Sequence, residues 1–201
     1  MYRKKYNRLA RHYDLLERPL DRFFEPLRER AVSLAEGRTL EVGVGTGKTL
    51  RYYPRGIELY AVDGSEAMLE VAREKAKKLG LEVIFQRADV ERLPFPDGFF
   101  DTVVSSFTFC TVPDPERGMG ELHRVLKPGG RAVFLEHTRS ESRTINALFL
   151  RPLGLLLGFL LSDNPLRDTH RLIGEFFEVE REETYYHGIV RLIVAKKPSA
   201  T

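Results

Sequence analysis

Three glycines spaced by single residues form the most informative cluster in the chain. They lie in residues 39–48, TLEVGVGTGK, where apolar and β-branched residues lead directly into Gly43, Gly45 and Gly47. Glycine adopts backbone conformations with positive φ, and because it has no Cβ atom it lets a ligand approach the main chain. A strand that ends in such a turn and opens a helix is where open α/β sheets bind nucleotide-like ligands. By itself the pattern also fits an ordinary strand-to-helix turn.

An acidic residue follows these glycines at the spacing of a nucleoside-binding site. Residues 58–65 read ELYAVDGS, a strand pattern that ends at Asp63, about 20 residues after Gly43. An acid at the tip of the second strand can accept hydrogen bonds from both hydroxyl groups of a ribose. The glycine spacing is GxGxG rather than the GxGxxG of dinucleotide-binding dehydrogenases, so a pyrophosphate-containing ligand is disfavoured.

The two motifs together resemble a known enzyme family. LEVGVGTGK and YAVDGSEAML are similar to motif I and the following acidic motif of the class I S-adenosylmethionine (SAM) methyltransferases. The resemblance covers residues 39–137 without a gap, and its most specific part is FCTVPDPERGMGELHRVLKPGGRAVFLEH. It implies an enzyme that uses SAM, releases S-adenosylhomocysteine and has no metal site. The residues that it assigns to the cofactor are Tyr13, Glu41, Gly43, Gly45, Gly47, Asp63, Gly64, Met68, Asp89, Val90 and Ser106.

Three of these assignments concern side chains whose roles need separate comment. In the family, an acid after the third strand accepts the adenine amino group, and ADVERLPF over residues 88–95 matches that loop. Taken alone, Asp89 also fits a turn in which its carboxylate bonds local amides. Glu41 stands where the family has an acid that orders water or the ammonium group of the ligand. Tyr13 resembles a family residue that closes over the cofactor, and a half-buried aromatic packing between helices is the alternative.

The acceptor of the methyl group is indicated by two subgroups of the family. The segment FCTVPDPER is similar to the quinone methyltransferases and to a group that methylates alkyl thiols, with phospholipid-methylating relatives. NPLRDT over residues 164–169 resembles a segment near the active site of the second group. We therefore expect a small lipophilic acceptor with a thiol or quinone-type nucleophile, and a phospholipid amine of the phosphatidylethanolamine type as the alternative.

The expected architecture is a single Rossmann-like α/β domain with a seven-stranded sheet whose last strand is antiparallel. Residues 1–36 are predicted to form two helices broken at Pro19, which cover the cofactor. Residues 37–137 form the SAM-binding core, with a sharp turn at KPGG over residues 127–130. Residues 138–169 form a substrate lid, and residues 170–201 a closing helix and a hairpin turned at His187 and Gly188.

The lid contains a dense apolar block at residues 145–161. It is too short for a comfortable membrane span, and an Arg-Pro pair interrupts it. Three interpretations remain open: a buried helix pair, the apolar wall of a substrate pocket, or a contact with a membrane surface.

Methyl transfer from a sulfonium is an in-line displacement with a good leaving group, so the protein mainly aligns the nucleophile and excludes water. A thiolate or quinolate needs little further help, whereas a harder nucleophile uses a general base. His137, at the end of the fifth predicted strand, is the favoured base, with His12 as the other candidate and a structural role for His137 as the alternative. Asp168 is expected to border the lid close to the acceptor.

Composition limits the remaining classes of function. The net charge of +3 is too small to indicate nucleic-acid binding, and the single cysteine allows neither an internal disulfide nor a CxxC metal site. Basic residues near the start are not followed by an apolar run, so a cytoplasmic location is expected. We expect a monomer or a homodimer, and membrane association through residues 145–161 is the alternative. A nucleotide-dependent oxidoreductase and a catalytically silent SAM-binding subunit are the rivals from other classes.

Overall fold

The computed structural model describes residues 2–138 and 168–199 together with residues 140, 142, 144 and 146; in the first 20 residues it describes the backbone but only some side chains. Its strands are β1 (Arg38–Val42), β2 (Glu58–Asp63), β3 (Val83–Arg87), β4 (Phe100–Ser106), β5 (Leu126–His137), β6 (Glu178–Tyr185) and β7 (Val190–Lys196). Its helices are α1 (Tyr2–Val32), the 3₁₀ turn η1 (Leu50–Tyr52), α2 (Glu66–Leu79), α3 (Pro115–Val125) and α6 (Thr169–Phe176).

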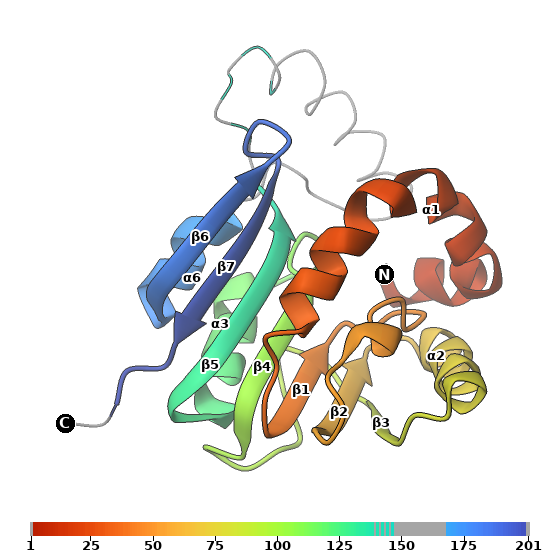
Figure 1. Cartoon of the computed structure of the whole chain (residues 1–201), viewed down its shortest axis with the longest axis horizontal. Helices are drawn as coiled ribbons and strands as arrows, with labels where there is room; N and C mark the ends of the chain where they lie inside the picture. Colours follow the sequence, from red (N-terminus) through yellow and green to blue (C-terminus); the bar gives the residue numbers. More distant parts are fainter. Residues whose placement is uncertain are drawn as a thin grey trace.

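The strands form one seven-stranded sheet in the order β3-β2-β1-β4-β5-β7-β6 (Figure 1). Strands β1 to β5 pair in parallel, and β7 runs antiparallel to both of its neighbours. The predicted fold class, with seven strands and the last one antiparallel, is therefore confirmed. Since the chain moves outward from β1 to β3 and then returns to β4, the strand order reverses between β1 and β4, where open α/β sheets bind ligands.

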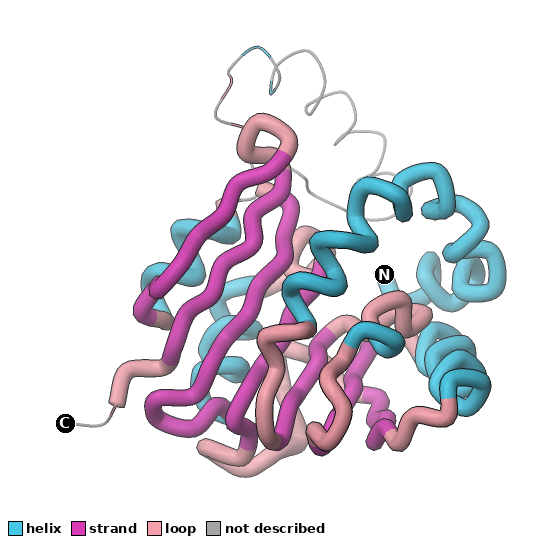
Figure 2. The backbone as a smooth tube through the Cα atoms, viewed as in Figure 1, coloured by secondary structure: helices cyan, strands magenta, loops and turns pink. Residues whose placement is uncertain are grey.

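Helices cover both faces of the sheet because its central strands are apolar on both sides. In β5, Val133 and Leu135 pack with residues of α1, whereas Ala132 and Phe134 pack with residues of α3 and α6 on the opposite face. Successive side chains of a strand point to opposite faces, which explains this separation. Helix α2 covers the β2 end of the same face as α1, through a third buried cluster (Figures 1 and 2).

Helix α1 corrects the prediction of two N-terminal helices. It runs without interruption from Tyr2 to Val32 although it contains Pro19 and Pro26. A proline inside a helix removes one backbone hydrogen bond and bends the axis, but the remaining bonds can carry the helix across it. Figure 2 shows the helix as one continuous segment that changes direction along its length. The prolines therefore bend the cover toward the glycine turn instead of ending it.

The segment over residues 127–130 also differs from the prediction. Instead of a separate turn before a strand at residue 131, it belongs to β5, which begins at Leu126 and shifts register against β4. Gly129 has a φ of 73°, and its backbone N–H donates to the carbonyl of Lys197 at 2.9 Å. Glycine permits the local bend, while the chain after β7 keeps the backbone paired.

Two connections show how local residues set the ends of the elements. Ser65 caps α2 by accepting a hydrogen bond from the backbone N–H of Met68, and Gly80 ends the helix in the left-handed conformation. The β6–β7 hairpin turns where predicted, but Tyr186 and His187 as well as Gly188 have positive φ values, of 52°, 57° and 78°. Only glycine adopts such angles without strain.

Candidate active site

A cavity opens at the carboxyl ends of β1, β2 and β4, beneath α1. Its volume is about 960 Å³ when the part open to solvent is included, which is in the range of small-molecule and cofactor sites. Its lining comes from the glycine turn, from the ends of β2 and β4 and from α1. The lining residues are Tyr13, Arg28, Glu41, Gly43, Val44, Gly45, Thr46, Lys48, Thr49, Val62, Asp63, Gly64, Met68, Ala88, Val90, Ser106, Phe107, Thr108, Thr111 and Val112.

The three glycines of the turn all have positive φ, but they serve different purposes. Gly43 has a φ of 66°, and a Cβ atom there would collide with the side chain of Thr108. Gly47 has a φ of 74° and abuts Leu50, whose Cδ1 would lie 2.6 Å from an added Cβ. Among the described residues, the nearest atom to a Cβ on Gly45 would be a backbone oxygen at 3.9 Å. Gly45 therefore offers its main chain to a ligand, while Gly47 lies outside the lining and permits the turn.

Asp63 connects the second strand to the glycine turn. Its Oδ2 accepts a hydrogen bond from the backbone N–H of Gly45 at 3.0 Å, and its Oδ1 accepts one from Ser65 at 2.8 Å. A carboxylate has about four acceptor positions, and this one also lines the cavity. Asp63 thus lies where the ribose acid was predicted, and it also fixes the turn.

Glu41 is a buried carboxyl group at the floor of the cavity. It is 1% exposed, and the hydroxyl of Thr49 donates to its two oxygens at 2.7 and 3.0 Å. Burial raises the pKa of Glu41 from 4.5 to about 7, although the hydrogen bond from Thr49 and the charge of Arg28 act in the opposite direction. A proton of Glu41 can therefore be exchanged near neutral pH, which suits an acid that meets a cationic ligand group.

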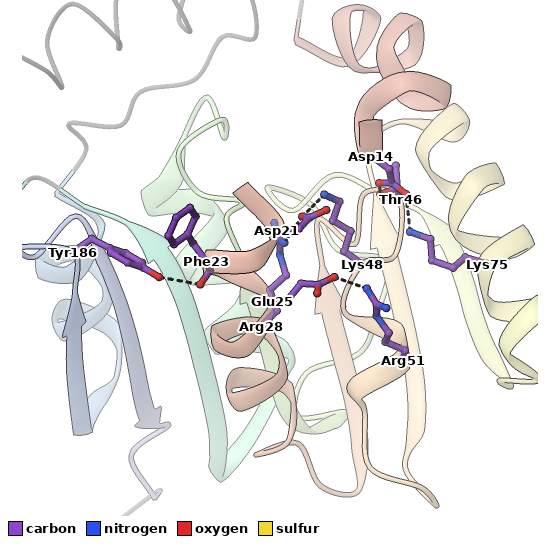
Figure 3. Close-up of polar contacts among 10 residues, drawn as sticks. All are labelled: Asp14, Asp21, Phe23, Glu25, Arg28, Thr46, Lys48, Arg51, Lys75 and Tyr186. Atoms are coloured by element: carbon purple, nitrogen blue, oxygen red, sulfur yellow. Dashed lines mark hydrogen bonds and ion pairs between the residues drawn. The ribbon is translucent and has the colours of Figure 1, made fainter. Parts of the chain in front are cut away.

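Helix α1 is fastened over the glycine turn by polar contacts at its N-terminal half (Figure 3). The Thr46 hydroxyl donates to Asp14 at 2.5 Å, and Lys75 of α2 donates to the other oxygen of Asp14 at 2.9 Å. Burial would raise the pKa of Asp14, but the hydrogen bonds from Thr46 and Lys75 outweigh it and lower the pKa below 3.8. These contacts place the neighbouring Tyr13 in the lining of the cavity.

Further along α1, acidic and basic groups share a second set of contacts. Asp21 accepts a hydrogen bond from Lys48 at 2.6 Å and another from Arg28 at 3.2 Å (Figure 3). Arg51 donates to Glu25 at 2.5 Å. Arg28 is buried, with 6% of its surface exposed, and both Arg28 and Lys48 line the cavity. Arg28 of α1 and Lys48 of the glycine turn therefore place two cations at the wall of the site.

The lining fits the group that the resemblance implies. A ribose would meet Asp63, the flat adenine ring would lie against the apolar side chains of Val90 and Val112, and the charged methionine part would meet Glu41 and Arg28. The Ser106 hydroxyl is buried in the lining and has no hydrogen-bond partner among the described residues. Buried hydroxyl groups are generally hydrogen-bonded, so Ser106 is suited to a polar atom of a ligand.

Besides Gly47, three predicted site residues lie outside this lining. Asp89 accepts a hydrogen bond from the backbone N–H of Glu91 at 3.3 Å, the local turn that was the alternative to adenine binding, while its neighbours Ala88 and Val90 do line the cavity. His137 packs against Phe107, with ring centroids 4.5 Å apart. Asp168 is exposed before α6, with an oxygen 3.0 Å from Nδ1 of His170.

Other predictions concern segments that are not described. The side chain of His12 lies outside the described residues, and so does the block at residues 145–161 apart from Asn146. Of residues 164–169, only Asp168 and Thr169 are described. The role of the lid and its contact with a membrane remain predictions. Among the helices of the described residues, none is long and apolar enough to cross a membrane.

Sequence reasoning missed several residues of the lining. Arg28 belongs to no motif that was used, and Lys48 ends the glycine motif but was given no role; their convergence depends on the path of α1. Phe107 and Thr108 follow a recognisable strand, but the left-handed φ of 54° at Phe107 leaves no mark in the sequence. The signal that was available for them is position, because the residues directly after a central parallel strand lie at the ligand edge of the sheet.

Comparisons with known proteins show the family of this chain. A family model described as a methyltransferase domain matches residues 40–134. A demethylmenaquinone methyltransferase of Thermus thermophilus is 45% identical over 140 residues, which are 65% of this chain and 63% of the relative. A phosphatidylethanolamine N-methyltransferase of Cereibacter sphaeroides is 44% identical over 108 residues, 53% of each chain. A ubiquinone/menaquinone biosynthesis C-methyltransferase of Geobacter sulfurreducens is 35% identical over 175 residues, 78% of this chain and 67% of the relative.

The chain thus spans less than two thirds of the first two of these relatives. Among solved structures, a SAM-dependent methyltransferase of Thermotoga maritima matches 98% of this chain and 100% of its own, with a TM-score of 0.72 and 26% identity. The cyclase SpnF, at 21% identity and a TM-score of 0.70 over 90% of this chain and 81% of its own, shares the fold alone. The protein belongs to the class I SAM-dependent methyltransferases, and the cofactor of this family is SAM.

Proposed function

We propose that this protein transfers the methyl group of SAM to a small lipophilic acceptor, with the ring carbon of a quinol as the leading nucleophile and a thiol as the next. The observation that carries the proposal is the composition of the cavity. It combines a nucleoside cradle of Gly45 and Asp63 with an aromatic side chain, Phe107, at the end of the central strand β4. A site that holds a cofactor and a second, apolar molecule needs both kinds of lining.

The relatives favour the quinol. Two of the three reported above are named for methylation of demethylmenaquinone or for ubiquinone/menaquinone biosynthesis, and one of them is a C-methyltransferase. A thiol acceptor rests on the resemblance of the segments FCTVPDPER and NPLRDT alone. A phospholipid amine is the second candidate, because the relative from Cereibacter sphaeroides is a phosphatidylethanolamine N-methyltransferase.

When bound, SAM supplies a methyl group already activated by a positively charged leaving group. The residues of the chain then have to bind the two molecules, align them and exclude water. The glycine turn and Asp63 fix the nucleoside, and the buried residues Arg28 and Glu41 face the charged groups at the floor of the cavity. Helix α1 closes the site from above through Tyr13. His137 lies behind Phe107, so strong dependence on it as a base is not expected.

The test is incubation of the purified protein with methyl-labelled SAM and a total bacterial lipid extract, followed by mass spectrometry. Label in a quinone fraction supports the leading acceptor, label in an alkyl thiol supports the second, and label in a phospholipid headgroup supports the alternative. Asp63→Ala should abolish the labelling, and Asp97→Ala, which removes an exposed acid away from the cavity, should leave it unchanged. Binding of S-adenosylhomocysteine without any labelled product would indicate a silent subunit, and heat from NAD but not from SAM an oxidoreductase.

A further inference from the structure

Five ring-bearing side chains from four separate segments meet beside the cavity, and we call them the aromatic cluster: Phe23, Phe24, Phe107, His137 and Tyr186. The ring of Phe24 lies 5.1 Å from that of Phe107 and 6.2 Å from that of Tyr186, and Phe23 lies 6.2 Å from Tyr186. At its outer end, Phe23 and Tyr186 each leave 42% of their surface exposed. At its inner end Phe107 lines the cavity. The cluster therefore extends from solvent to the site.

Backbone strain is concentrated around this cluster. Within the described part of the chain, the residues other than glycine that have positive φ are Phe107, Tyr186 and His187. Two of them are members of the cluster and the third is the next residue in the chain. Bulky residues rarely adopt this conformation, and where they do, the surrounding structure has to hold them in place, most often at active sites and ligand clamps.

The contacts that hold Phe107 are built into the ends of β4 and β5. Its backbone N–H donates to the carbonyl of Leu135 at 2.7 Å. The next two backbone N–H groups, of Thr108 and Phe109, donate to the buried carboxylate of Glu136 at 3.1 to 3.2 Å. Glu136 is fully buried. A buried carboxylate that serves two successive amides fixes the direction in which this turn leaves the sheet.

The second strained turn is held in a comparable way. The hydroxyl of Thr138 donates to the carbonyl of Gly188 at 2.7 Å, and that of Ser140 donates to the carbonyl of His187 at 2.6 Å. The Tyr186 hydroxyl donates to the carbonyl of Phe23 in α1 at 3.0 Å (Figure 3). The hairpin turn is therefore fixed to the end of β5 on one side and to α1 on the other. Both strained turns hold rings of the same cluster.

Phe107 is the member of the cluster that faces the cavity. Behind its ring lies His137, at a centroid distance of 4.5 Å and an angle of 35°, and the guanidinium carbon of Arg28 lies 5.4 Å from the ring centre. His137 and Phe24 are outside the cavity lining, whereas Phe107 is in it. His137 supports the ring from outside the cavity, while Arg28 shares the cavity lining with it; because Phe107 is only half-buried, part of its surface remains for a second molecule.

We propose that Phe107 selects the acceptor: its ring is the platform against which a flat aromatic acceptor packs, and the rest of the aromatic cluster forms the wall that leads there from solvent. This proposal rests on the function proposed above, since it assumes that the cavity holds an acceptor beside the cofactor. Aromatic rings favour offset-stacked or edge-to-face contact with one another beyond the burial of their area. Phe107 should therefore favour an aromatic acceptor over a saturated one of the same shape.

The test measures binding instead of turnover, so that it does not require the natural acceptor. Protein saturated with S-adenosylhomocysteine is titrated with 1-naphthol, whose fluorescence is free of tryptophan background because the chain contains no tryptophan. The saturated counterpart, decahydro-1-naphthol, is measured by competition. Phe107→Asn removes the ring but retains a residue that tolerates positive φ, and Phe107→Gly is a second variant without a ring. Phe107→Tyr keeps the ring, and Phe99→Leu is the matched control, an aromatic residue at the opposite end of β4.

In the two variants without a ring, the preference for 1-naphthol over decahydro-1-naphthol should fall by threefold or more, with an expected value of about fivefold. Phe107→Tyr and Phe99→Leu should keep the preference of the original protein, and affinity for S-adenosylhomocysteine should stay within about threefold in all four. A smaller fall, or an equal loss for both ligands, overturns the proposal. Binding of S-adenosylhomocysteine without any binding of 1-naphthol to the original protein also overturns it. Failure to bind S-adenosylhomocysteine at all would instead refute the proposed function.

Discussion

The buried carboxyl group of Glu41 should make the stability of the protein depend on pH in a direction opposite to that of most acids. Its pKa is raised from 4.5 to about 7 by burial. Between these two values the unfolded chain releases the proton while the folded protein keeps it, so the contribution of this group to stability falls as pH rises. This contribution to stability is fully present below about pH 4.5 and is lost once the pH has risen above about 7. The shift corresponds to about 3 kcal/mol.

The perturbation that isolates this effect is Glu41→Gln, which keeps the shape and removes the ionisation. The free energy of unfolding of both proteins is measured by denaturant titration without ligand, at intervals from pH 4.5 to 7.5. The stability of the original protein relative to the variant should fall by about 2–3 kcal/mol over that range. Parallel pH profiles, with a constant difference between the two proteins, would refute the claim that burial holds the proton on Glu41.

The same group connects pH to cofactor binding. If Glu41 meets the ammonium group of the ligand, it has to be ionised in the complex, and binding below pH 7 must release a proton. Affinity for S-adenosylhomocysteine should then rise up to about tenfold per pH unit between pH 5.5 and 6.5 and level off above pH 7.5. Calorimetry in buffers with different ionisation enthalpies counts the released protons. An affinity without pH dependence, or one that Glu41→Gln leaves unchanged, would show that the carboxylate does not meet the ligand.

Four further variants test the remaining assignments. Asp63→Ala should weaken the binding of S-adenosylhomocysteine by about 1.5–3 kcal/mol in calorimetry. It should also lower the free energy of unfolding by about 1 kcal/mol, because two backbone amides lose their acceptor. An unchanged affinity would exclude the ribose role. Gly43→Ala should destabilise the protein by more than Gly45→Ala in denaturant titration, since its Cβ would collide with Thr108, and equal effects would contradict the packing of the turn. His137→Ala should reduce turnover less than about 100-fold and leave a rate that still rises with pH; a larger loss with a flat pH profile would identify it as the base.

The arrangement of the sheet could be predicted from the sequence because it depends on patterns that are local and repeated. Most of the strands are short apolar runs, and several turns carry their own glycine, proline or capping residue, such as Ser65 at the start of α2. The prediction for Pro19 was wrong for a related reason. A proline rule describes one hydrogen bond, whereas continuation of α1 depends on the whole helix and on the side chains that fasten it to the glycine turn.

The site was predicted less completely than the fold. Gly45 and Asp63 lie in the cavity as their motifs imply, while Gly47 and Asp89 lie outside its lining. A motif records which residues occur together, but not which of them face the ligand. Arg28 and Phe107 enter the site through the course of a bent helix and through a strained turn, and both depend on contacts between residues distant in the chain.

The fastening of α1 has a consequence for the kinetics of the enzyme. The contacts of Asp14 with Lys75, of Asp21 with Lys48 and of Glu25 with Arg51 join charges that are partly open to water (Figure 3). Raising the salt concentration from 0.1 to 1 M shortens the screening length from about 10 to about 3 Å and weakens such pairs, whereas the apolar contacts of the core are not screened. Since α1 roofs the cavity, ionic strength acts on how long a cofactor or its product stays bound, separately from how stably the sheet is folded.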